Sequence, residues 1–144
     1  MVVTSMPKDL SNSQAGEAFL ARLESDYPDF RFRTGVRFAF TPPKTITIGP
    51  PQPNSALLTL HELAHAILEH KHDNTHISRL KHEAEAWERA KQLAAHYNIP
   101  YDADFAEDKL DTYRNHLHQK SLCPTCATTR YESPTGTFHC PFCP

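Results

Sequence analysis

The stretch His61-Glu62-Leu63-Ala64-His65 lies within an apolar, helix-favouring run from Ser55 to His70. On an α-helix, residues i and i+4 lie one above the other on the same face, so both imidazoles can point at a single metal ion. A catalytic zinc ion takes three protein ligands, with nitrogen donors at about 2.0–2.1 Å, and leaves a fourth position for water. The spacing of His61 and His65 therefore predicts a zinc site that requires one further ligand.

Glu62 is expected at the rim of the same helical face, beside the two histidines. Bound zinc lowers the pKa of its water to about 7, so a carboxylate within hydrogen-bond reach can accept the water proton and later protonate a leaving amine. Asn54 or Ser55 offers an N-cap, and the helix is apolar over most of its circumference, which predicts that it is buried. Buried histidines and glutamates are costly unless they are bonded or ligated, which favours a functional site over incidental surface histidines.

The candidates for the third ligand lie 17 to 20 positions after His65 and are His82, Glu83 and Glu85. They fall in a second helix, expected from Thr75 or Ser78 to Tyr97, whose apolar stripe is Ile77, Leu80, Ala84, Trp87, Ala90 or Ala94, and Tyr97. At about 100° per residue, Glu83 lies on the side of this stripe. His82 and Glu85 point away from it. A carboxylate that faces the core is costly unless a cation holds it, so Glu83 is the favoured ligand and the other two are the alternatives.

The C-terminal segment from Ser121 carries all four cysteines of the chain, in two C-P-x-C pairs separated by thirteen residues: Cys123, Cys126, Cys140 and Cys143. Two such pairs are typical of a zinc ribbon, in which each pair supplies two thiolates to one tetrahedral ion. A module this short has almost no core, so metal binding would supply most of its folding free energy. His139 adjoins a cysteine ligand, but four cysteines suffice. We therefore predict a second, structural zinc ion.

Length and composition limit the number of domains, the class of protein and the cellular compartment. The chain has 144 residues and a formal net charge of −2, which suits one domain with a small appendix and argues against a general nucleic-acid binder. No apolar run reaches the length of about 18 residues that a membrane helix needs, and no signal-like N-terminus is present. A cytoplasmic protein is expected. In that reducing compartment the paired cysteines are predicted to bind metal rather than to form disulfides.

The rest of the chain predicts an α+β fold. After a loose tail at residues 1–10, a helix is expected from Ser11 or Ser13 to Tyr27, with Ala15, Phe19, Leu20 and Leu23 on its apolar side. Residues 30–40 suggest a strand pair or one bent strand, with Arg31, Arg33 and Arg37 on a solvated face or, as the alternative, at a site for an acidic substrate. A short strand follows at 44–48, and a last helix is expected from Asp102 or Ala103 to Lys120.

Three smaller expectations concern the surroundings of the zinc site. Because prolines flank residues 44–48 on both sides, this strand is expected at a sheet edge, where Thr45 and Thr47 would receive an extended substrate by strand addition. The three histidines between residues 70 and 76 are predicted to lie in a solvated turn, with extra metal ligation as the alternative. Tyr97, Tyr101, Tyr113 or one of the spare histidines could stabilise an oxyanion, and the sequence does not choose among them.

The pattern of His61, Glu62 and His65 followed by Glu83-x-x-Ala86 resembles that of gluzincins. In particular, residues 83–90 resemble the E-x-E-A-x-x-F-A stretch of ImmA/IrrE-type metallopeptidases, with Arg89 in place of the phenylalanine, and the resemblance covers about residues 15–100. It implies a minimal zincin, with an N-terminal helix, a small three-stranded sheet, a metal helix and a glutamate helix. It also implies zinc on His61, His65 and Glu83, with Glu62 as general base. Members of that group cleave or regulate proteins such as repressors.

A second resemblance leads to a different family. SprT-like proteins combine H-E-x-x-H with a C-terminal zinc ribbon and act on DNA-bound proteins, and their third ligand is a histidine. The segment from His82 to Trp87 roughly resembles their later motif, but the helical phase places His82 off the apolar face.

These observations predict a minimal zincin-like metallopeptidase domain at residues 1–120, followed by a zinc ribbon at 121–144. The predicted activity is hydrolysis of a protein or peptide by attack of zinc-bound water, with Glu62 as the base and the ribbon recruiting the substrate or a partner protein. Two other classes stay open. A non-catalytic zinc-binding module would be favoured by a fourth protein ligand such as His70 or His72. A nucleic-acid adaptor would rely on the ribbon, Arg130 and the lysine-bearing helices, and the acidic net charge makes it the weakest alternative.

Overall fold

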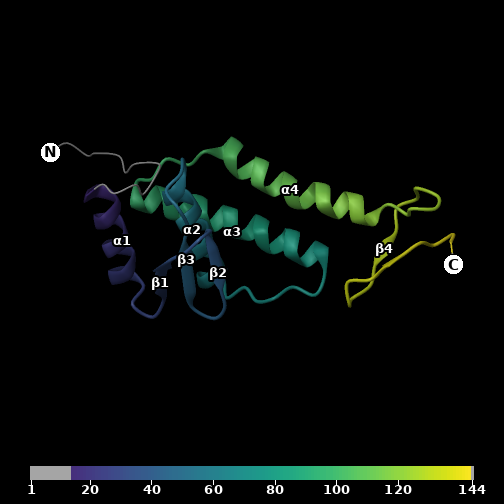
Figure 1. Cartoon of the computed structure of the whole chain (residues 1–144), viewed down its shortest axis with the longest axis horizontal. Helices are drawn as coiled ribbons and strands as arrows, with labels where there is room; N and C mark the ends of the chain where they lie inside the picture. The colour runs from purple at the N-terminus through teal and green to yellow at the C-terminus, as the bar shows by residue number, and fades with distance from the viewer. Residues whose placement is uncertain (1–13, 144) are drawn as a thin grey trace. The chain divides into compact units, whose positions relative to one another are not determined.

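The computed structural model describes residues 14–143 and shows an α+β protein (Figure 1). Its described helices are α1 (Gln14–Asp26), α2 (Ser55–Ile67), α3 (His76–Tyr97) and α4 (Ala103–Ser121). Its described strands are β1 (Arg31–Thr34), β2 (Ala39–Thr41), β3 (Thr45–Ile48), β4 (Tyr131–Glu132) and β5 (Phe138–His139). The class and the order of the elements agree with the sequence prediction. The expected tail at residues 1–10 and the helix start at Ser11 or Ser13 lie outside the described residues.

The chain divides into two compact units. The first contains the described residues up to Lys71 together with Glu85–Asp102, and the second contains His72–Ala84 and the residues from Ala103 onward. The uninterrupted helix α3 contributes its first part to the second unit and its remainder to the first. The predicted boundary between a peptidase domain at 1–120 and a ribbon at 121–144 stays a prediction.

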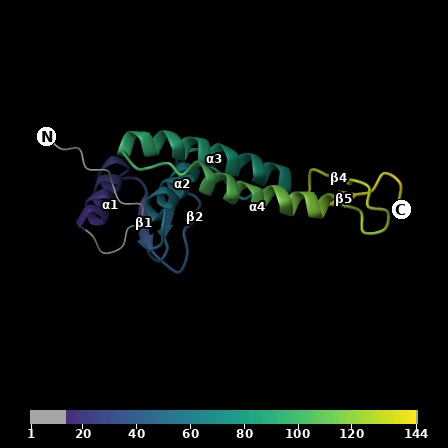
Figure 2. The same cartoon turned by 90° about the horizontal axis from the view of Figure 1, so that it is seen from above.

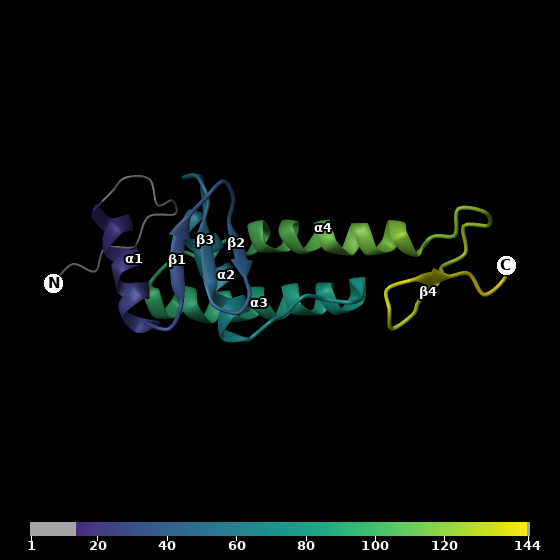
Figure 3. The ribbon, with the colours of Figure 1, turned by 60° about the horizontal axis from the view of Figure 1, so that its bottom comes forward.

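The sheet of the first unit has the strand order β1-β3-β2, which can be followed in Figure 3. Strand β3 pairs in parallel with β1, where Phe32 faces Ile46, and antiparallel with β2, where Phe40 faces Ile46. The expectation that residues 44–48 form an edge strand is therefore wrong. The flanking prolines lie outside β3, so the backbone N–H groups of this strand can donate to both neighbours. In the described sheet, β1 and β2 are the outer strands.

Strand addition at Thr45 and Thr47 is excluded by the same arrangement, because backbone groups paired on both sides cannot receive a further strand. Thr47 is buried, and its hydroxyl accepts a hydrogen bond of 3.0 Å from Arg33 Nε. This contact gives Arg33 a structural role on its own sheet.

Helix α2 is the centre of the core. The run Ser55–Ala66 is buried except at Glu62, as the apolar circumference predicts, and Ile46 and Ile48 of β3 are buried with it. The helix begins after Asn54, which has a left-handed φ of 67° and makes no side-chain cap bond. Within the helix, the Thr59 hydroxyl donates to the Ser55 carbonyl at 2.9 Å, a bond that does not cap the first amide groups. The helix stops at Ile67, three residues before the end of the apolar run.

Helix α3 has a shorter buried face than its sequence suggests. Ala86, Trp87, Ala90, Leu93, Ala94 and Tyr97 are buried. Ile77, predicted on the same stripe, is 57% exposed, and Ala84 is also exposed. The apolar stripe thus starts at Ile77, about two and a half turns before Ala86, the first buried residue of α3, and the sequence periodicity alone cannot reveal this difference.

In the second unit, the β4–β5 hairpin caps the start of α3 (Figure 2). Glu132 accepts hydrogen bonds from the backbone N–H of His76 at 2.8 Å and of Ile77 at 3.2 Å, and from His76 Nδ1 at 2.7 Å. Thr75 Oγ1 accepts from the Ser78 N–H at 3.0 Å. The first amide groups of an α-helix have no partner within the helix and attract negative charge, so a carboxylate from 56 positions away completes this terminus.

We expect Glu132→Ala to lower the free energy of unfolding of the second unit by about 1–2 kcal/mol, because it removes the cap of α3. Burial raises the pKa of Glu132, but hydrogen bonds from the backbone and ring of His76 and the backbone of Ile77 lower it below 4.5 overall. This contribution is therefore complete above pH 4.5 and is lost as the pH falls through the lowered pKa. Urea unfolding at neutral and acid pH measures both effects. Glu107→Ala, at an exposed site on α4, is the control, and equal stability of the two variants would contradict the capping role.

Among residues 14–143, none of the helices combines the length and the apolar character that crossing a membrane requires.

Candidate metal centres

The two histidines of α2 face one point. Their Nε2 atoms lie 3.2 Å apart, and the side chains are only 5% and 8% exposed for His61 and His65. Two nitrogens at about 2.0–2.1 Å from one tetrahedral zinc ion would be separated by about 3.3–3.4 Å. The observed separation fits a pair of ligands on a single ion.

Two aromatic side chains hold the planes of these imidazoles. The indole of Trp87 on α3 stacks on His61 with ring centroids 4.1 Å apart, and Phe40 on β2 is parallel to His65 at 6.3 Å. The sequence indicated Trp87 as a core residue and Phe40 as a strand residue, but it gave no sign that either would touch a candidate ligand. Such walls restrict ring rotation and keep water away from the ligand atoms.

Glu83 lies on α3 one turn before Trp87, on the same face of the helix. Because Trp87 is stacked on His61, this face is directed at the α2 histidines. One ligand atom each from His61, His65 and Glu83 lies within 4.8 Å of the others. The donor set of two imidazoles and one carboxylate is one that zinc accepts in catalytic sites.

The alternative third ligands have other neighbours. His82 Nδ1 lies 2.6 Å from Asp73 Oδ1. Glu85 Oε2 lies 3.2 Å from His70 Nε2. His70, His82 and Glu85 also form a group whose ligand atoms lie within 4.8 Å of one another, and this group does not include the α2 pair. The grouping around His61 and His65 thus contains Glu83 and neither alternative.

Glu62 directly follows the first histidine on α2 and is half-buried, in contrast to the buried residues on either side. A rotation of about 100° from His61 brings its carboxylate to the edge of the histidine face rather than onto it. A carboxylate in this position is accessible to a water molecule without taking a ligand position. This is the placement that a proton acceptor beside the two imidazoles needs.

His70 differs from its prediction as a solvated turn residue. It is 8% exposed, and its Nδ1 lies 2.8 Å from His65 Nδ1. Since Nδ1 and Nε2 are on different edges of an imidazole, His70 touches the edge of His65 that faces away from His61. His70 is therefore a neighbour of a candidate ligand and not a fourth ligand beside the Nε2 pair.

The tyrosines suggested for an oxyanion have their own partners. Tyr97 is 1% exposed and donates its hydroxyl to Asp26 Oδ2 at 2.6 Å. Burial and this hydrogen bond raise the pKa of Tyr97. Tyr113 lies beneath the guanidinium of Arg79 at 5.1 Å, and Tyr101 beneath the ammonium of Lys91 at 5.8 Å. The hydroxyl of Tyr97 is thus committed to the fold, whereas the rings of Tyr101 and Tyr113 each pack against a cationic side chain.

The four cysteines of the second unit form the other candidate centre. One sulfur atom from each of Cys123, Cys126, Cys140 and Cys143 lies within 4.8 Å of the others, and all four are free thiols. The sulfurs of Cys126 and Cys140 are 3.7 Å apart. Two thiolates at about 2.3 Å from a tetrahedral zinc ion would be separated by about 3.8 Å, so the cluster fits that ion.

The backbone of the first C-P-x-C pair stabilises thiolates. Hydrogen bonds from the hydroxyl and backbone of Thr128 lower the pKa of Cys126 from 9.0 to about 6. Backbone hydrogen bonds from Cys126 and Thr125 lower the pKa of Cys123. Ala127 makes the tight turn possible with a left-handed φ of 61°, and its N–H donates to the Cys123 carbonyl at 2.8 Å. These hydrogen bonds favour the thiolate, the form of cysteine that binds metal, at Cys123 and Cys126. Side-chain hydrogen bonds with Cys126 and Cys140 raise the pKa of Cys143, so the second pair is not favoured in the same way.

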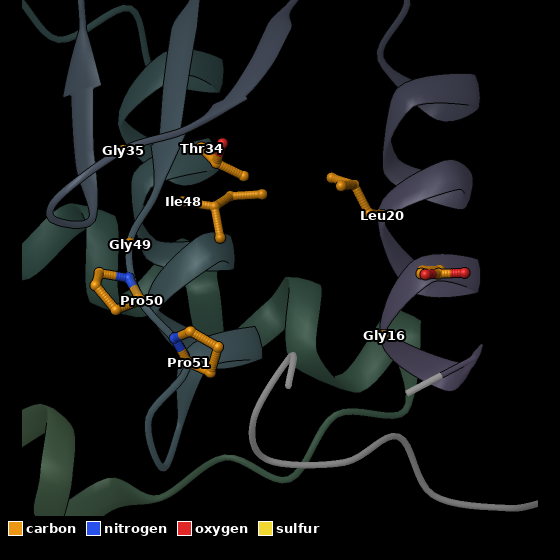
Figure 4. A pocket seen from close by; sticks show the side chains of 9 residues that line it. Gly16, Leu20, Thr34, Gly35, Ile48, Gly49, Pro50 and Pro51 are labelled. Atoms are coloured by element: carbon orange, nitrogen blue, oxygen red, sulfur yellow. The ribbon is translucent and has the colours of Figure 1, made fainter. Parts of the chain in front are cut away.

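A groove of about 330 Å³ lies elsewhere in the first unit, between α1 and the end of β3 (Figure 4). Leu20 and Ile48 point toward each other across it, and Pro50 and Pro51 line one side. None of its lining residues is a candidate metal ligand. The groove is therefore separate from both candidate centres.

No protein-family model, no curated protein and no solved structure matches this chain. The resemblance to ImmA/IrrE-type metallopeptidases, and the alternative resemblance to SprT-like proteins, therefore stay predictions that rest on the residues quoted above.

Proposed function

We propose that the protein is a zinc metallopeptidase of minimal zincin-like fold, which hydrolyses peptide bonds in a protein or peptide. The observation that carries the proposal is that ligand atoms of His61, His65 and Glu83 lie within 4.8 Å of one another, with the Nε2 atoms of the two histidines 3.2 Å apart. Glu62 follows His61 on α2 at a half-buried position. This geometry agrees with what the gluzincin resemblance implies for the same residues. The ribbon cysteines would hold a second, structural zinc ion.

A zinc ion held by His61, His65 and Glu83 would polarise a substrate carbonyl and lower the pKa of a water molecule to about 7. Glu62 accepts the proton of the attacking water and later delivers it to the leaving amine. Trp87 and Phe40 hold the imidazole rings in place, so the site needs little reorganisation during the reaction.

The position of His70 favours this proposal over a purely structural zinc site. A structural site is usually closed by four protein ligands, and the candidates for the fourth were His70 and His72. His72 is exposed and belongs to none of the described groups of candidate ligands. The ring of His70 instead contacts Nδ1 of His65, on the edge of that imidazole away from the Nε2 atom that faces His61, so His70 does not supply a fourth ligand beside the Nε2 pair. A zinc ion held by only His61, His65 and Glu83 would keep a coordination position for water, as a hydrolytic site requires.

The direct test is to incubate the full-length, zinc-loaded chain with a peptide library and with unfolded proteins, and to identify new termini by mass spectrometry. We expect cleavage that stops when zinc is removed by a chelator and returns when zinc is added. A chain in which both centres are shown to hold zinc, yet which cleaves no bond in either substrate set, would contradict the proposal.

A further inference from the structure

We propose that His70 and Glu85 are positioning residues, which hold His65 in the tautomer that a metal ligand requires. The inference rests on the metal site of the proposed function and does not depend on hydrolysis. Its basis is a continuous series of contacts within the first unit. His65 Nδ1 lies 2.8 Å from His70 Nδ1, and His70 Nε2 lies 3.2 Å from Glu85 Oε2. At the other end, His65 Nε2 faces His61 Nε2.

The series determines where each proton lies. A glutamate carboxylate only accepts hydrogen bonds, so the proton between Glu85 and His70 must be on His70 Nε2. A neutral His70 then has a lone pair on Nδ1, and the 2.8 Å contact requires that His65 carries its proton on Nδ1. The lone pair of His65 is consequently on Nε2, the atom that faces His61. Glu85 thus selects the ligand form of His65 through His70.

The fold places His70 by a specific helix ending. The N–H of Glu69 donates to the Ala66 carbonyl at 3.1 Å, and the N–H of His70 donates to the His65 carbonyl at 3.0 Å. These two bonds form a Schellman motif, in which the residue after the helix takes a left-handed conformation. Glu69 has a φ of 57°, although glycine is the usual residue there. The turn brings His70 back beside His65, with ring centroids 5.0 Å apart.

His70 also belongs to the group with His82 and Glu85, which suggests a second cation as the competing interpretation. The contacts favour the positioning role. Both ring nitrogens of His70 are already engaged, one with His65 and the other with Glu85, so metal binding by His70 would break one of these hydrogen bonds. The Nδ1 atom of His82 in turn lies 2.6 Å from Asp73.

The test compares two replacements of His70 in the full-length chain. His70→Phe keeps a planar aromatic ring, somewhat larger than imidazole, at this buried position but removes both nitrogens. His70→Asn places its side-chain oxygen as many bonds from the backbone as Nδ1, so it can still accept from His65. His72→Phe makes the same chemical change at an exposed histidine two positions away and serves as the control.

The first readout is zinc affinity, measured by competition with a chromophoric chelator. Cobalt substitution separates the two centres, because only the cysteine centre gives thiolate charge-transfer bands. We expect His70→Phe to weaken binding at the α2 site by about 10–100-fold, while His70→Asn and His72→Phe stay close to wild type. If His70 acted through packing alone, the zinc affinity of the α2 site would instead fall in His70→Asn and stay near wild type in His70→Phe. Unchanged affinity in His70→Phe would overturn the proposal, as would a third zinc ion per chain that this variant loses.

The second readout is the ¹⁵N spectrum of the histidine rings with the α2 site free of metal. We expect the wild-type His65 proton on Nδ1, and a mixture of tautomers in His70→Phe. A wild-type His65 proton on Nε2 would overturn the proposal. This readout also separates the metallopeptidase proposal from the positioning role of His70. If only the cysteine centre binds metal, the proposed function fails. The tautomer of His65 then still tests the role of His70.

Discussion

Replacement of Glu62 by glutamine is expected to reduce peptide hydrolysis by about 10²–10⁴-fold, the range typical for loss of a general base, while zinc content and thermal stability stay at wild-type levels. The side chain keeps its size and one carbonyl oxygen but loses the carboxylate that accepts a proton. Because Glu62 lies at the half-buried edge of α2 and is absent from the candidate ligand group, its neutralisation leaves the metal ligands intact. The measurement is the initial rate on a peptide identified in the cleavage screen.

Glu88→Gln is a matched control for this variant. It makes the same chemical change at an exposed position on α3, one residue after Trp87. We expect it to retain wild-type activity, zinc content and stability. If Glu62→Gln retained more than a tenth of wild-type activity with full zinc content, Glu62 would not be the base, and the assigned proton pathway would be wrong.

The second large effect concerns metal stoichiometry. We expect about two zinc ions per wild-type chain by elemental analysis, and a loss of about one in each of two variants, Glu83→Ala and Cys123→Ser. Glu83→Ala removes one of three ligands from the α2 site and leaves the ribbon unchanged. Cys123→Ser removes one of four thiolates from a segment that has little core of its own.

The structural consequences of these two variants should differ. Zinc binding contributes about 10–16 kcal/mol of apparent free energy in small zinc modules, so Cys123→Ser is expected to unfold the ribbon as well as to lose its metal. Unfolding of the ribbon would also withdraw Glu132 from the first turn of α3. Hydrogen exchange at the His76 and Ile77 amides should therefore accelerate in Cys123→Ser and stay slow in Glu83→Ala.

His139→Ala and Glu88→Ala are the controls for the two centres. His139 is exposed and adjoins a cysteine ligand, and Glu88 is exposed on the helix that carries Glu83, so both variants should keep about two zinc ions. A wild-type chain with one zinc ion, unaffected by Glu83→Ala and lost in Cys123→Ser, would show that the α2 site is empty. The peptidase proposal would then lose most of its support.

Local patterns of the sequence were sufficient to predict the helices and the candidate metal ligands. The positions of His61 and His65 one turn apart, the phase that favours Glu83, and the two pairs of cysteines are spacings within one helix or one turn. Backbone geometry translates such spacings directly into directions, whatever the rest of the chain does. For this reason the buried helix α2 and the grouping of Glu83 with the α2 histidines agree with the sequence analysis.

Contacts between distant segments were decided only by the tertiary structure. Strand β3 is central because β1 and β2, which precede it in the chain, pair on its two sides, and strand order leaves no local signature. Glu132 contacts the start of α3 from strand β4, and no helical or strand periodicity in the sequence links these two segments. His70 looked like one of three histidines in a polar turn. The left-handed backbone of Glu69 places the His70 ring beside His65. Such a conformation is hard to predict from sequence when the residue is not glycine. The sequence by itself determined which residues could bind metal, whereas tertiary packing determined which groups orient them.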